Sequence, residues 1–419
     1  MRIALLGLYQ GPSLVKSRPT LRNKSMSRQL KIELVASALH GNGASVEILS
    51  SGEVIDHEFR LYPEFSEAEP FHPRIPIHYS SALAVRWLNG AWSDSQLLRL
   101  FKTRHQVSPY DLVIIWNMKS SHVKCANYAM QRCQLPVILA YEDDAFVSRT
   151  GEVMRGGLLS NYRAESCRKL LKAVSGGIGV SPYLLSQFPD ETPKLLLRGA
   201  VGDDLVAAGL RSRESKKNWI LFAGTHDSTN GVAELIEAWR LKRIPDWELH
   251  ITGHGELTEE LRNRAQNLEG IRFHGLVSRQ TLVDLLSSAR ICINPHAVSR
   301  TQGNLFAFKI IEYLGAGANV ISTPMGKLES QLETGINYIP ENSPETIAKT
   351  LQLVVNERRF ERTAMDAAQE MYGSPAVAKS LNALVGQVMA TQGQYKANET
   401  TRQVECKDKD GNVVREPVL

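Results

Sequence analysis

The sequence predicts an α/β protein made of two domains, each with a doubly wound parallel sheet. Residues 291–323 give the clearest indication, because a buried apolar segment is followed there by a glycine-bearing loop, a helical apolar period and a second apolar segment. Such a strand–loop–helix–strand order is the unit from which parallel sheets are built. The same alternation recurs in both halves of the chain, whose 419 residues can form two or three hydrophobic cores.

The composition is that of an ordinary globular protein, with 43% hydrophobic and 22% charged residues. The excess of 49 basic over 44 acidic residues suits a phosphorylated substrate or an anionic membrane surface and does not require nucleic acid. No run of 18 apolar residues is present that would predict a membrane span. Five cysteines without CxxC spacing indicate a reducing interior and argue against a zinc site. We therefore expect a cytoplasmic protein, and peripheral association with the inner membrane face stays open.

The first domain is expected to span residues 1–205, and its elements follow from alternating apolar segments and helical periods. Strands are predicted at 2–8, 44–49, 111–116, 136–140, 176–180 and 194–197, and helices at 26–40, 81–104, 121–133, 161–173 and 182–188. Residues 51–80 show no clean period and are predicted to form a loop.

A long polar insertion, residues 10–24, separates the first strand from the first helix, and Gly7 and Gly11 bracket the turn at its start. The insertion carries four basic side chains, which are Lys16, Arg18, Arg22 and Lys24. They lie either in a solvated, mobile loop or against a phosphate or an acceptor, and the solvated loop is the simpler interpretation.

The second domain is expected to span residues 218–372, after a charged linker at 211–217. Its predicted strands are 219–223, 247–251, 271–274, 291–293 and 319–322, and its predicted helices are 232–241, 259–267, 279–287, one beginning near 305, and 344–356. A helix at 376–389, within a segment 373–390, closes the fold, and whether it packs back on the first domain stays open. Residues 391–419 are polar and aperiodic, which predicts a disordered tail.

Two charged patterns lie where such sheets bind ligands. Asp143 and Asp144 follow a predicted strand directly, so they contact a ligand at the carboxyl edge of the sheet or else cap a helix. Lys309 and Glu312 are three residues apart on one helix face. Two interpretations are open. Either the two side chains form a surface ion pair, or the lysine binds a phosphate and the glutamate binds a sugar hydroxyl.

Several familiar catalytic motifs are missing from the sequence. Two glycine-bearing turns, at 224–231 and 253–255, each follow a predicted strand, but neither contains GxGxxG. His250 and His254 lie on a strand and its turn, so they are a weak metal pair. The absence of GxSxG, HExxH and GxxxxGK[ST] leaves serine hydrolase, zincin and P-loop chemistry unsupported.

Residues 218–340 resemble the glycosyltransferases of family four. Four segments correspond in order to that family's motifs: WILFAGTHDSTNGVAELIEAW, WELHITGHGELTEEL, IRFHGLVSRQTLVDLLSSARICINPH and NLFAFKIIEYLGAGANVIST. The resemblance implies the GT-B architecture, in which two Rossmann-like domains face a central cleft. It also implies that a sugar moves from a nucleotide-sugar donor to an acceptor with retention of configuration and without a metal ion. The donor is a substrate, so no cofactor is expected.

The resemblance assigns roles to individual residues. Lys309 and the N–H groups around Gly303, Leu305 and Phe306 would bind the diphosphate. Glu312 matches the family's second glutamate, which binds the ribose hydroxyls, and Gly224 would let the backbone approach the phosphates closely. On the facing domain, Gly11, Asp143 and Asp144 are the candidates for contact with the acceptor or the donor sugar.

The chain departs from the family at three positions. The first glutamate of the family is replaced by Asn304, and two phosphate-binding cations are replaced by Thr225 and Asn230. Lys309 could restore one charge and Arg300 another. We therefore expect an active transferase with a variant donor site and a glycan, lipid-linked or protein acceptor. The alternatives are a catalytically silent GT-B protein that binds nucleotide or glycan as a partner subunit, and a nucleotide-sugar epimerase.

Overall fold

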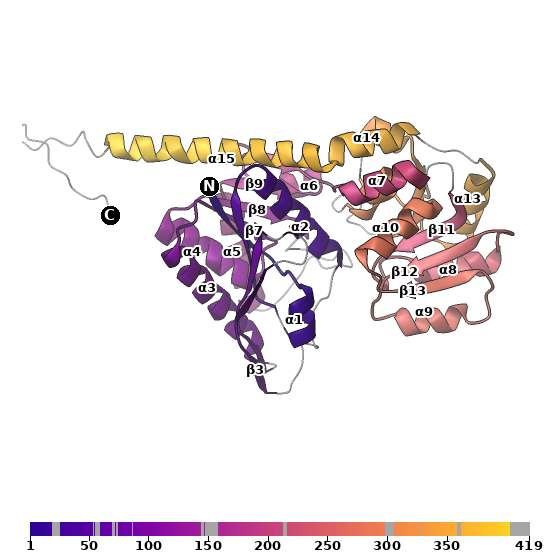
Figure 1. The fold of residues 1–419 in the computed structure, drawn as a ribbon, viewed down its shortest axis with the longest axis horizontal. Coiled ribbons are helices and arrows are strands. Elements are labelled where there is room, and N and C mark those ends of the chain that lie inside the picture. Colours follow the sequence, from indigo (N-terminus) through magenta and orange to yellow (C-terminus); the bar gives the residue numbers. More distant parts are fainter. Residues whose placement is uncertain are drawn as a thin grey trace, which may run out of the picture.

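The computed structural model describes most of the chain (Figure 1). The described residues are 1–18, 26–52, 54, 59–68, 72, 74–85, 87–143, 146, 158–212, 216–297, 306–326, 328–357 and 362–402. They form two α/β domains, each built around a predominantly parallel sheet with helices on both faces. The predicted fold class is therefore confirmed.

The sheet of the first domain has eight strands in the order β10-β9-β8-β7-β1-β2-β5-β4. Its strands are β1 (Arg2–Leu6), β2 (Ser45–Ser50), β4 (Phe65–Ala68), β5 (Pro76–Tyr79), β7 (Leu112–Trp116), β8 (Val137–Tyr141), β9 (Gly176–Gly179) and β10 (Lys194–Leu196). All neighbours pair in parallel except β4, which runs antiparallel to β5 at the edge. The chain leaves the adjoining strands β1 and β7 in opposite directions, so their carboxyl ends form the crevice where open α/β sheets bind ligands.

Helices cover both faces of this sheet, because alternate strand residues point to opposite sides. The helices are α1 (Pro12–Ser17), α2 (Met26–Gly41), α3 (Asn89–Val107), α4 (Ser120–Cys133), α5 (Leu158–Ala173) and α6 (Pro182–Leu185). Ile115 packs with Phe101 of α3 on one face, and its neighbour Ile114 packs with Ile32 of α2 on the other. Figure 1 shows α3, α4 and α5 together on the face opposite α2.

The sheet of the second domain has six parallel strands in the order β13-β12-β11-β14-β15-β16. They are β11 (Lys217–Ala223), β12 (Glu248–Thr252), β13 (Ile271–Gly275), β14 (Ala289–Asn294), β15 (Asn319–Ser322) and β16 (Ile336–Tyr338). The helices are α7 (Asp203–Ser212), α8 (Val232–Leu241), α9 (Thr258–Ala265), α10 (Arg279–Ser288), α11 (Lys309–Gly315), α12 (Ser330–Glu333), α13 (Pro344–Glu357) and α14 (Arg362–Tyr372). Leu235 of α8 and Ile347 of α13 share one cluster with Phe222, whereas Val283 of α10 and Ile310 of α11 share another with Leu221.

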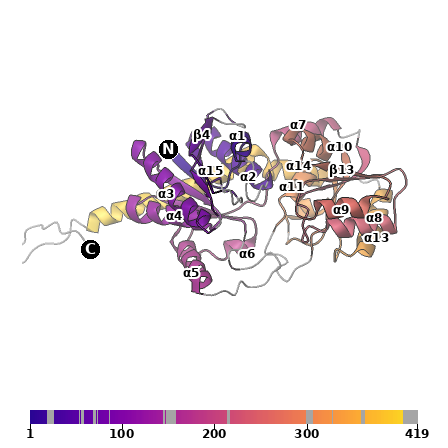
Figure 2. The ribbon, with the colours of Figure 1, turned by 90° about the horizontal axis from the view of Figure 1, so that it is seen from below.

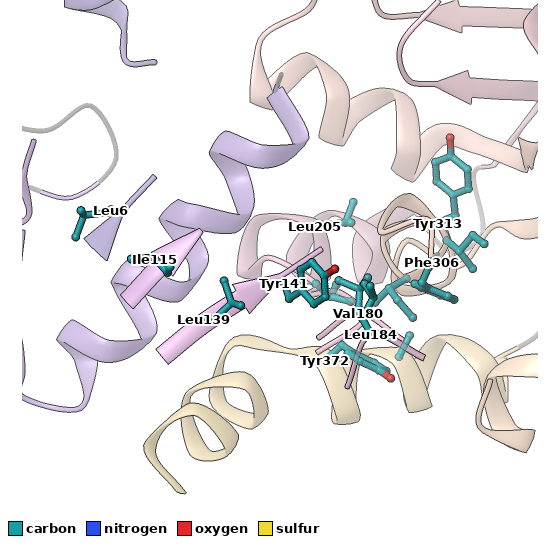
Figure 3. Packing of buried hydrophobic residues seen from close by; sticks show 14 of the residues in the cluster. Leu6, Ile115, Leu139, Tyr141, Val180, Leu184, Leu205, Phe306, Tyr313 and Tyr372 are labelled. Carbon is teal, nitrogen blue, oxygen red and sulfur yellow. The ribbon is translucent and has the colours of Figure 1, made fainter. Parts of the chain in front are cut away.

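The two domains are joined by packed side chains. Phe306 and Tyr313 of the second domain lie in one cluster with Val180 and Leu184 of the first (Figure 3). Phe308 is buried in the core of the first domain. The last helix, α15 (Ser374–Arg402), returns to the first domain, where its apolar side chains join the same core, and Figures 1 and 2 show it running along that domain.

Residues 51–80 are not only a loop, as the sequence predicted. They contain β3 (Arg60–Tyr62), β4 and β5, and β6 (Ala82–Ala84) follows within the predicted helix 81–104, which begins only at Asn89. These strands have three or four residues each, too few for a period to be recognised. β3 and β5 pair with strands distant in sequence, β6 and β2 respectively, whereas β4 pairs with the adjacent β5.

The polar insertion also differs from the expectation of a solvated loop, because it contains α1. Arg18 is 1% exposed and donates hydrogen bonds to the backbone carbonyls of Ser51, Gly52, Pro63 and Ser80. Neither the solvated-loop nor the phosphate interpretation holds for this residue. Lys16 is exposed, and Arg22 and Lys24 lie outside the described residues.

The structure corrects two further boundaries and adds three elements. The predicted first-domain end at 205 falls within α7, which packs against α10 and α11 of the second domain. α15 continues to Arg402, past its predicted end and into the segment predicted to be disordered. α12, β16 and α14 were not predicted. Within the described part of the chain, no helix has the length and apolarity needed to cross a membrane.

Candidate functional site

Lys309 is the first residue of α11, and its side chain reaches the turn that follows β11. The helix begins there rather than at Leu305, with Phe308 at its N-cap position. The ammonium Nζ donates a hydrogen bond to Asn230 Oδ1 over 3.1 Å and lies 4.5 Å from the centroid of the Phe222 ring. A Cβ atom on Gly224 would lie 3.0 Å from this Nζ, so glycine leaves the room that the ammonium occupies.

Asp227 organises the turn that holds the ammonium. Its Oδ1 accepts hydrogen bonds from the backbone N–H and hydroxyl of Thr229 and from the backbone N–H and side-chain amide of Asn230. Because the Asn230 amide nitrogen is bound in this way, its oxygen is directed to Lys309. Burial opposes ionisation of Asp227, but these hydrogen bonds outweigh it and hold the pKa of the carboxyl below its usual value.

Lys309 carries a positive charge that the described residues do not neutralise by a direct ion pair. Burial lowers the pKa of its ammonium to about 8, although the nearby Asp227 acts in the opposite direction. Its hydrogen-bond partner, Asn230, is a neutral amide. A desolvated ammonium of this kind is poised to bind an anion, since an anion would recover the electrostatic stabilisation lost on burial.

The loops at this edge of the second sheet are in close contact. Gly231 has φ = 70°, and a Cβ on it would lie 1.8 Å from the carbonyl oxygen of Pro295. Gly253 has φ = 129°, and a Cβ on it would lie 1.8 Å from the carbonyl oxygen of Gly224. Both positions therefore require glycine, both for the backbone conformation and for the close approach.

His226 braces the same turn without adding charge. Its side chain is buried, with Nδ1 3.0 Å from Thr258 Oγ1, and burial lowers its pKa to about 4. The imidazole is therefore neutral at pH 7. Thr225, the neighbouring predicted site residue, is exposed on the turn.

Glu312 lies on the next turn of α11 and has a different partner from Lys309. It is 8% exposed, and its Oε1 accepts a hydrogen bond from Arg279 Nη1 over 2.8 Å. The same guanidinium binds Asp204 through Nε and Nη2. Burial raises the pKa of Glu312, and the contact with Arg279 partly offsets this. The interpretation of Lys309 and Glu312 as a surface ion pair is therefore wrong.

On the first domain, the predicted residues engage neighbouring side chains. The Gly11 N–H donates to the Tyr79 hydroxyl over 3.0 Å, and this hydroxyl donates to Glu67 Oε1. Asp143 is exposed and accepts a hydrogen bond from the Asn117 amide over 2.9 Å. Asn117 has φ = 57°, a conformation to which asparagine is suited, and its Oδ1 in turn accepts the Asp143 N–H.

A mostly apolar pocket lies at the carboxyl edge of the first sheet, where Phe308 of the second domain contributes to its lining. Its lining includes Trp116, Leu197, Phe308 and a half-buried ion pair between Lys31 and Glu142, with Nζ and Oε1 2.8 Å apart. The Lys31 ammonium also lies 5.1 Å from the centroid of the Phe308 ring. Since Phe308 directly precedes Lys309, this pocket adjoins the ammonium site.

The structure thus brings Gly224, Asn230 and Lys309 together, with Thr225 on the same turn. Phe306 is buried, with the guanidinium carbon of Arg198 5.7 Å from its ring centroid. The other predicted site residues Arg300, Gly303, Asn304, Leu305 and Asp144 lie outside the described residues. Sequence reasoning assigned no role to Asp227, Arg279, Asn117 and Lys31; only Asp227 has a local signal, as an aspartate that opens a polar turn.

His250 and His254, which the sequence offered as a weak metal pair, have different environments. His250 stacks on Trp219 with ring centroids 4.0 Å apart, and it lies within hydrogen-bonding distance of Glu248 and His274. His254 is exposed. Among the residues that the structure describes, no group of three His, Cys, Asp or Glu side chains is arranged to hold a metal ion.

Comparison with known families places the similarity in the second domain. Residues 217–357 match the family model described as "Glycosyl transferases group 1". A phosphatidyl-myo-inositol mannosyltransferase of Mycobacterium tuberculosis is 28% identical over 151 residues, which are 35% of this chain and 39% of that protein. The corresponding protein of Mycolicibacterium smegmatis is 32% identical over 120 residues, 28% of this chain and 30% of that protein. The matched region thus spans well under half of either relative.

Solved structures resemble the chain over nearly its full length. A sucrose-phosphate synthase from Thermosynechococcus elongatus has a TM-score of 0.72 at 16% identity and covers 93% of this chain and 100% of its own. HepE of Anabaena, in complex with UDP-glucose, has a TM-score of 0.61 at 12% identity and covers 92% of this chain and 99% of its own. These likenesses concern the fold, and they confirm the expected GT-B architecture.

Proposed function

We propose that this chain is a retaining glycosyltransferase that moves a sugar from a nucleotide-sugar to a glycan, lipid-linked or protein acceptor without a metal ion. We further propose that it acts in the cytoplasm, at or near the inner face of the membrane. The observation that carries the proposal is the Lys309 ammonium at the glycine turn of the domain that matches group 1 glycosyl transferases. It is desolvated, and among the described residues its hydrogen-bond partner is the neutral amide of Asn230.

The proposed reaction separates charge at the nucleotide. The bond between the anomeric carbon and the diphosphate oxygen breaks, the acceptor oxygen bonds to that carbon, and the acceptor's proton leaves with the nucleoside diphosphate. Negative charge builds on the diphosphate as its bond opens. A fixed cation such as Lys309 therefore stabilises the transition state more than the bound substrate, which is the condition for catalysis.

The remaining site residues have supporting roles in this proposal. Glu312, held by Arg279, would accept hydrogen bonds from the ribose hydroxyls through its other oxygen. Asn304, in place of the family's first glutamate, would bind hydroxyls of the transferred sugar. The printed names of the similar proteins fit this chemistry, since HepE was crystallised with UDP-glucose and the mycobacterial relatives are mannosyltransferases of a phosphatidyl-inositol lipid.

A catalytically silent GT-B protein is the second candidate, and one observation favours it. Both predicted donor-binding side chains already have partners, because Lys309 is bonded to Asn230 and Glu312 to Arg279. Two cations of the family pattern are also replaced, by Thr225 and Asn230. Such a protein would bind a nucleotide or a glycan without turning it over.

A panel of UDP-, GDP- and ADP-sugars distinguishes the two candidates. Thermal shift measures binding, and analysis of released or transferred sugar measures turnover. We expect one nucleotide class to raise the melting temperature and its sugar to be released. Lys309→Ala should abolish both effects, whereas Lys124→Ala, which removes a surface lysine paired with Asp94, should preserve them. Stabilisation without turnover would favour the silent protein, and the absence of any stabilisation or turnover across the panel would contradict the transferase.

A further inference from the structure

Two tyrosine–glutamate pairs in the first domain share a hydroxyl-to-carboxylate hydrogen bond but differ in how the second carboxylate oxygen is bound. In one, the Tyr79 hydroxyl donates to Glu67 Oε1 over 2.5 Å, and the Ser13 N–H donates to Glu67 Oε2 over 3.2 Å. Both oxygens of that carboxylate are thus bonded within the domain. In the other pair, the Tyr9 hydroxyl donates to Glu33 Oε1 over 2.8 Å.

The second oxygen of Glu33 has a different environment. Gln29 Nε2 also donates to Oε1, over 3.3 Å, so one oxygen takes both hydrogen bonds. No donor among the described residues binds Oε2, and the side chain is only half-buried. A carboxylate oriented by two donors on one oxygen presents the other as a ready hydrogen-bond acceptor.

The position of this carboxylate is that of a ligand site. Tyr9 follows β1, and Glu33 lies on α2, the next long helix. They therefore lie beside the carboxyl ends of β1 and β7, where the direction of chain travel across the first sheet reverses. The Lys31–Glu142 ion pair and the interdomain pocket lie at the same edge.

Glu33 also lies within electrostatic reach of the second domain. Arg279, the residue that holds Glu312, lies close enough to favour ionisation of Glu33, against the larger effect of burial, which raises its pKa. Lys31 acts in the same way on Glu312. The two walls of the cleft are thus within electrostatic reach of each other at this point.

We infer that Glu33, oriented by Tyr9 and Gln29, binds a hydroxyl group of a sugar or other polyol at the first-domain wall of the cleft. The chemistry favours a hydroxyl donor, because the group offered to the cleft is a carboxylate oxygen and the neighbouring ammonium of Lys31 is already paired. An anionic group would meet repulsion at Glu33. Naming this polyol the sugar acceptor rests on the proposed function; the binding site itself does not.

The test uses glucose, mannose, myo-inositol and glycerol as probes, with and without UDP, and measures binding by saturation-transfer NMR. Wild type should bind at least one probe. Glu33→Gln should weaken that binding about tenfold, because a charge-assisted hydrogen bond is replaced by a neutral one. Tyr9→Phe should have a smaller effect in the same direction. The matched control is Glu67→Gln, which alters the equivalent pair whose oxygens are both taken, and it should bind as wild type does.

The outcomes separate this inference from the proposed function. If no probe binds to wild type, or if Glu33→Gln and Glu67→Gln weaken binding equally, the inference is overturned. Release of sugar from the donor to water is measured on the wild type in parallel. Polyol binding without any nucleotide binding would overturn the transferase and keep the site. Nucleotide turnover without polyol binding would keep the transferase and overturn the polyol site.

Discussion

The two walls come from the same kind of sheet, but the charged groups Lys309 and Glu33, which have no ion-pair partner among the described residues, are of opposite sign. The second-domain wall, at the turn that follows β11, presents the ammonium of Lys309. This ammonium is bonded to the neutral amide of Asn230 and lies beside Gly224. The first-domain wall presents two carboxylates: Glu33, one oxygen of which no donor among the described residues binds, and Glu142, which is paired to Lys31. The loops that follow parallel strands can therefore carry either positive or negative side chains without a change of fold. Under the proposed function, this difference would direct the diphosphate to one wall and the hydroxyl-bearing substrate to the other.

The largest expected effect comes from removing the cation of the second-domain wall. Lys309→Met should reduce transfer by about 10²–10³-fold, because one fixed donor to the leaving group is worth about 3–4 kcal/mol in such sites. The double variant Asn230→Lys/Lys309→Met returns an ammonium to the same turn from the opposite side, and part of the activity should return with it. Initial rates and far-UV circular dichroism measure the two variants. Near-wild-type rates for Lys309→Met would show that the cation has no role.

Glu312 should contribute less, and chiefly to nucleotide affinity. Glu312→Ala removes one charged hydrogen-bond acceptor and should weaken binding of the nucleoside diphosphate about tenfold to about a hundredfold. Calorimetry of the free nucleotide measures this. The control is Asp204→Ala, which removes the other partner of Arg279 but leaves Glu312 in place, and it should change affinity by no more than about threefold because that pair is half-exposed. Equal losses in both variants would make Glu312 only a structural partner of Arg279.

The sequence predicted the second wall better than the first, for physical reasons. Helix 232–241 was predicted to the residue because a glycine precedes it and its apolar period is regular. Lys309 was found because it lies on the helix that follows a strand and a loop. Arg279 was missed because its bond to Glu312 spans 33 residues and leaves no local pattern. Arg18 was misinterpreted for the same reason, since its carbonyl partners are brought together only by the fold.

The pH dependence of nucleotide binding sharpens the contrast between the walls. Burial lowers the pKa of Lys309 to about 8, so the free protein loses this charge as pH rises through that value. The protonated form is the one that binds a diphosphate. Affinity should therefore be full below pH 8 and fall about tenfold per unit above it. Lys309→Arg should show weaker dependence between pH 7 and pH 9, because the guanidinium stays charged. A wild-type affinity that is flat across this range would refute the role of the lysine.

The smallest expected effect lies on the first wall, at Asp143. Its carboxylate is exposed and already bonded to Asn117, so it can contribute only as an exposed charge does, about 0–1 kcal/mol. Asp143→Ala should raise the KM for the acceptor by up to about fivefold and leave nucleotide affinity unchanged. Asp190→Ala, which alters a fully exposed aspartate near β10, is the control and should change neither. If Asp143→Ala instead weakens nucleotide binding, the carboxylate contacts the donor, and the division of the two substrates between oppositely charged walls does not hold at this position.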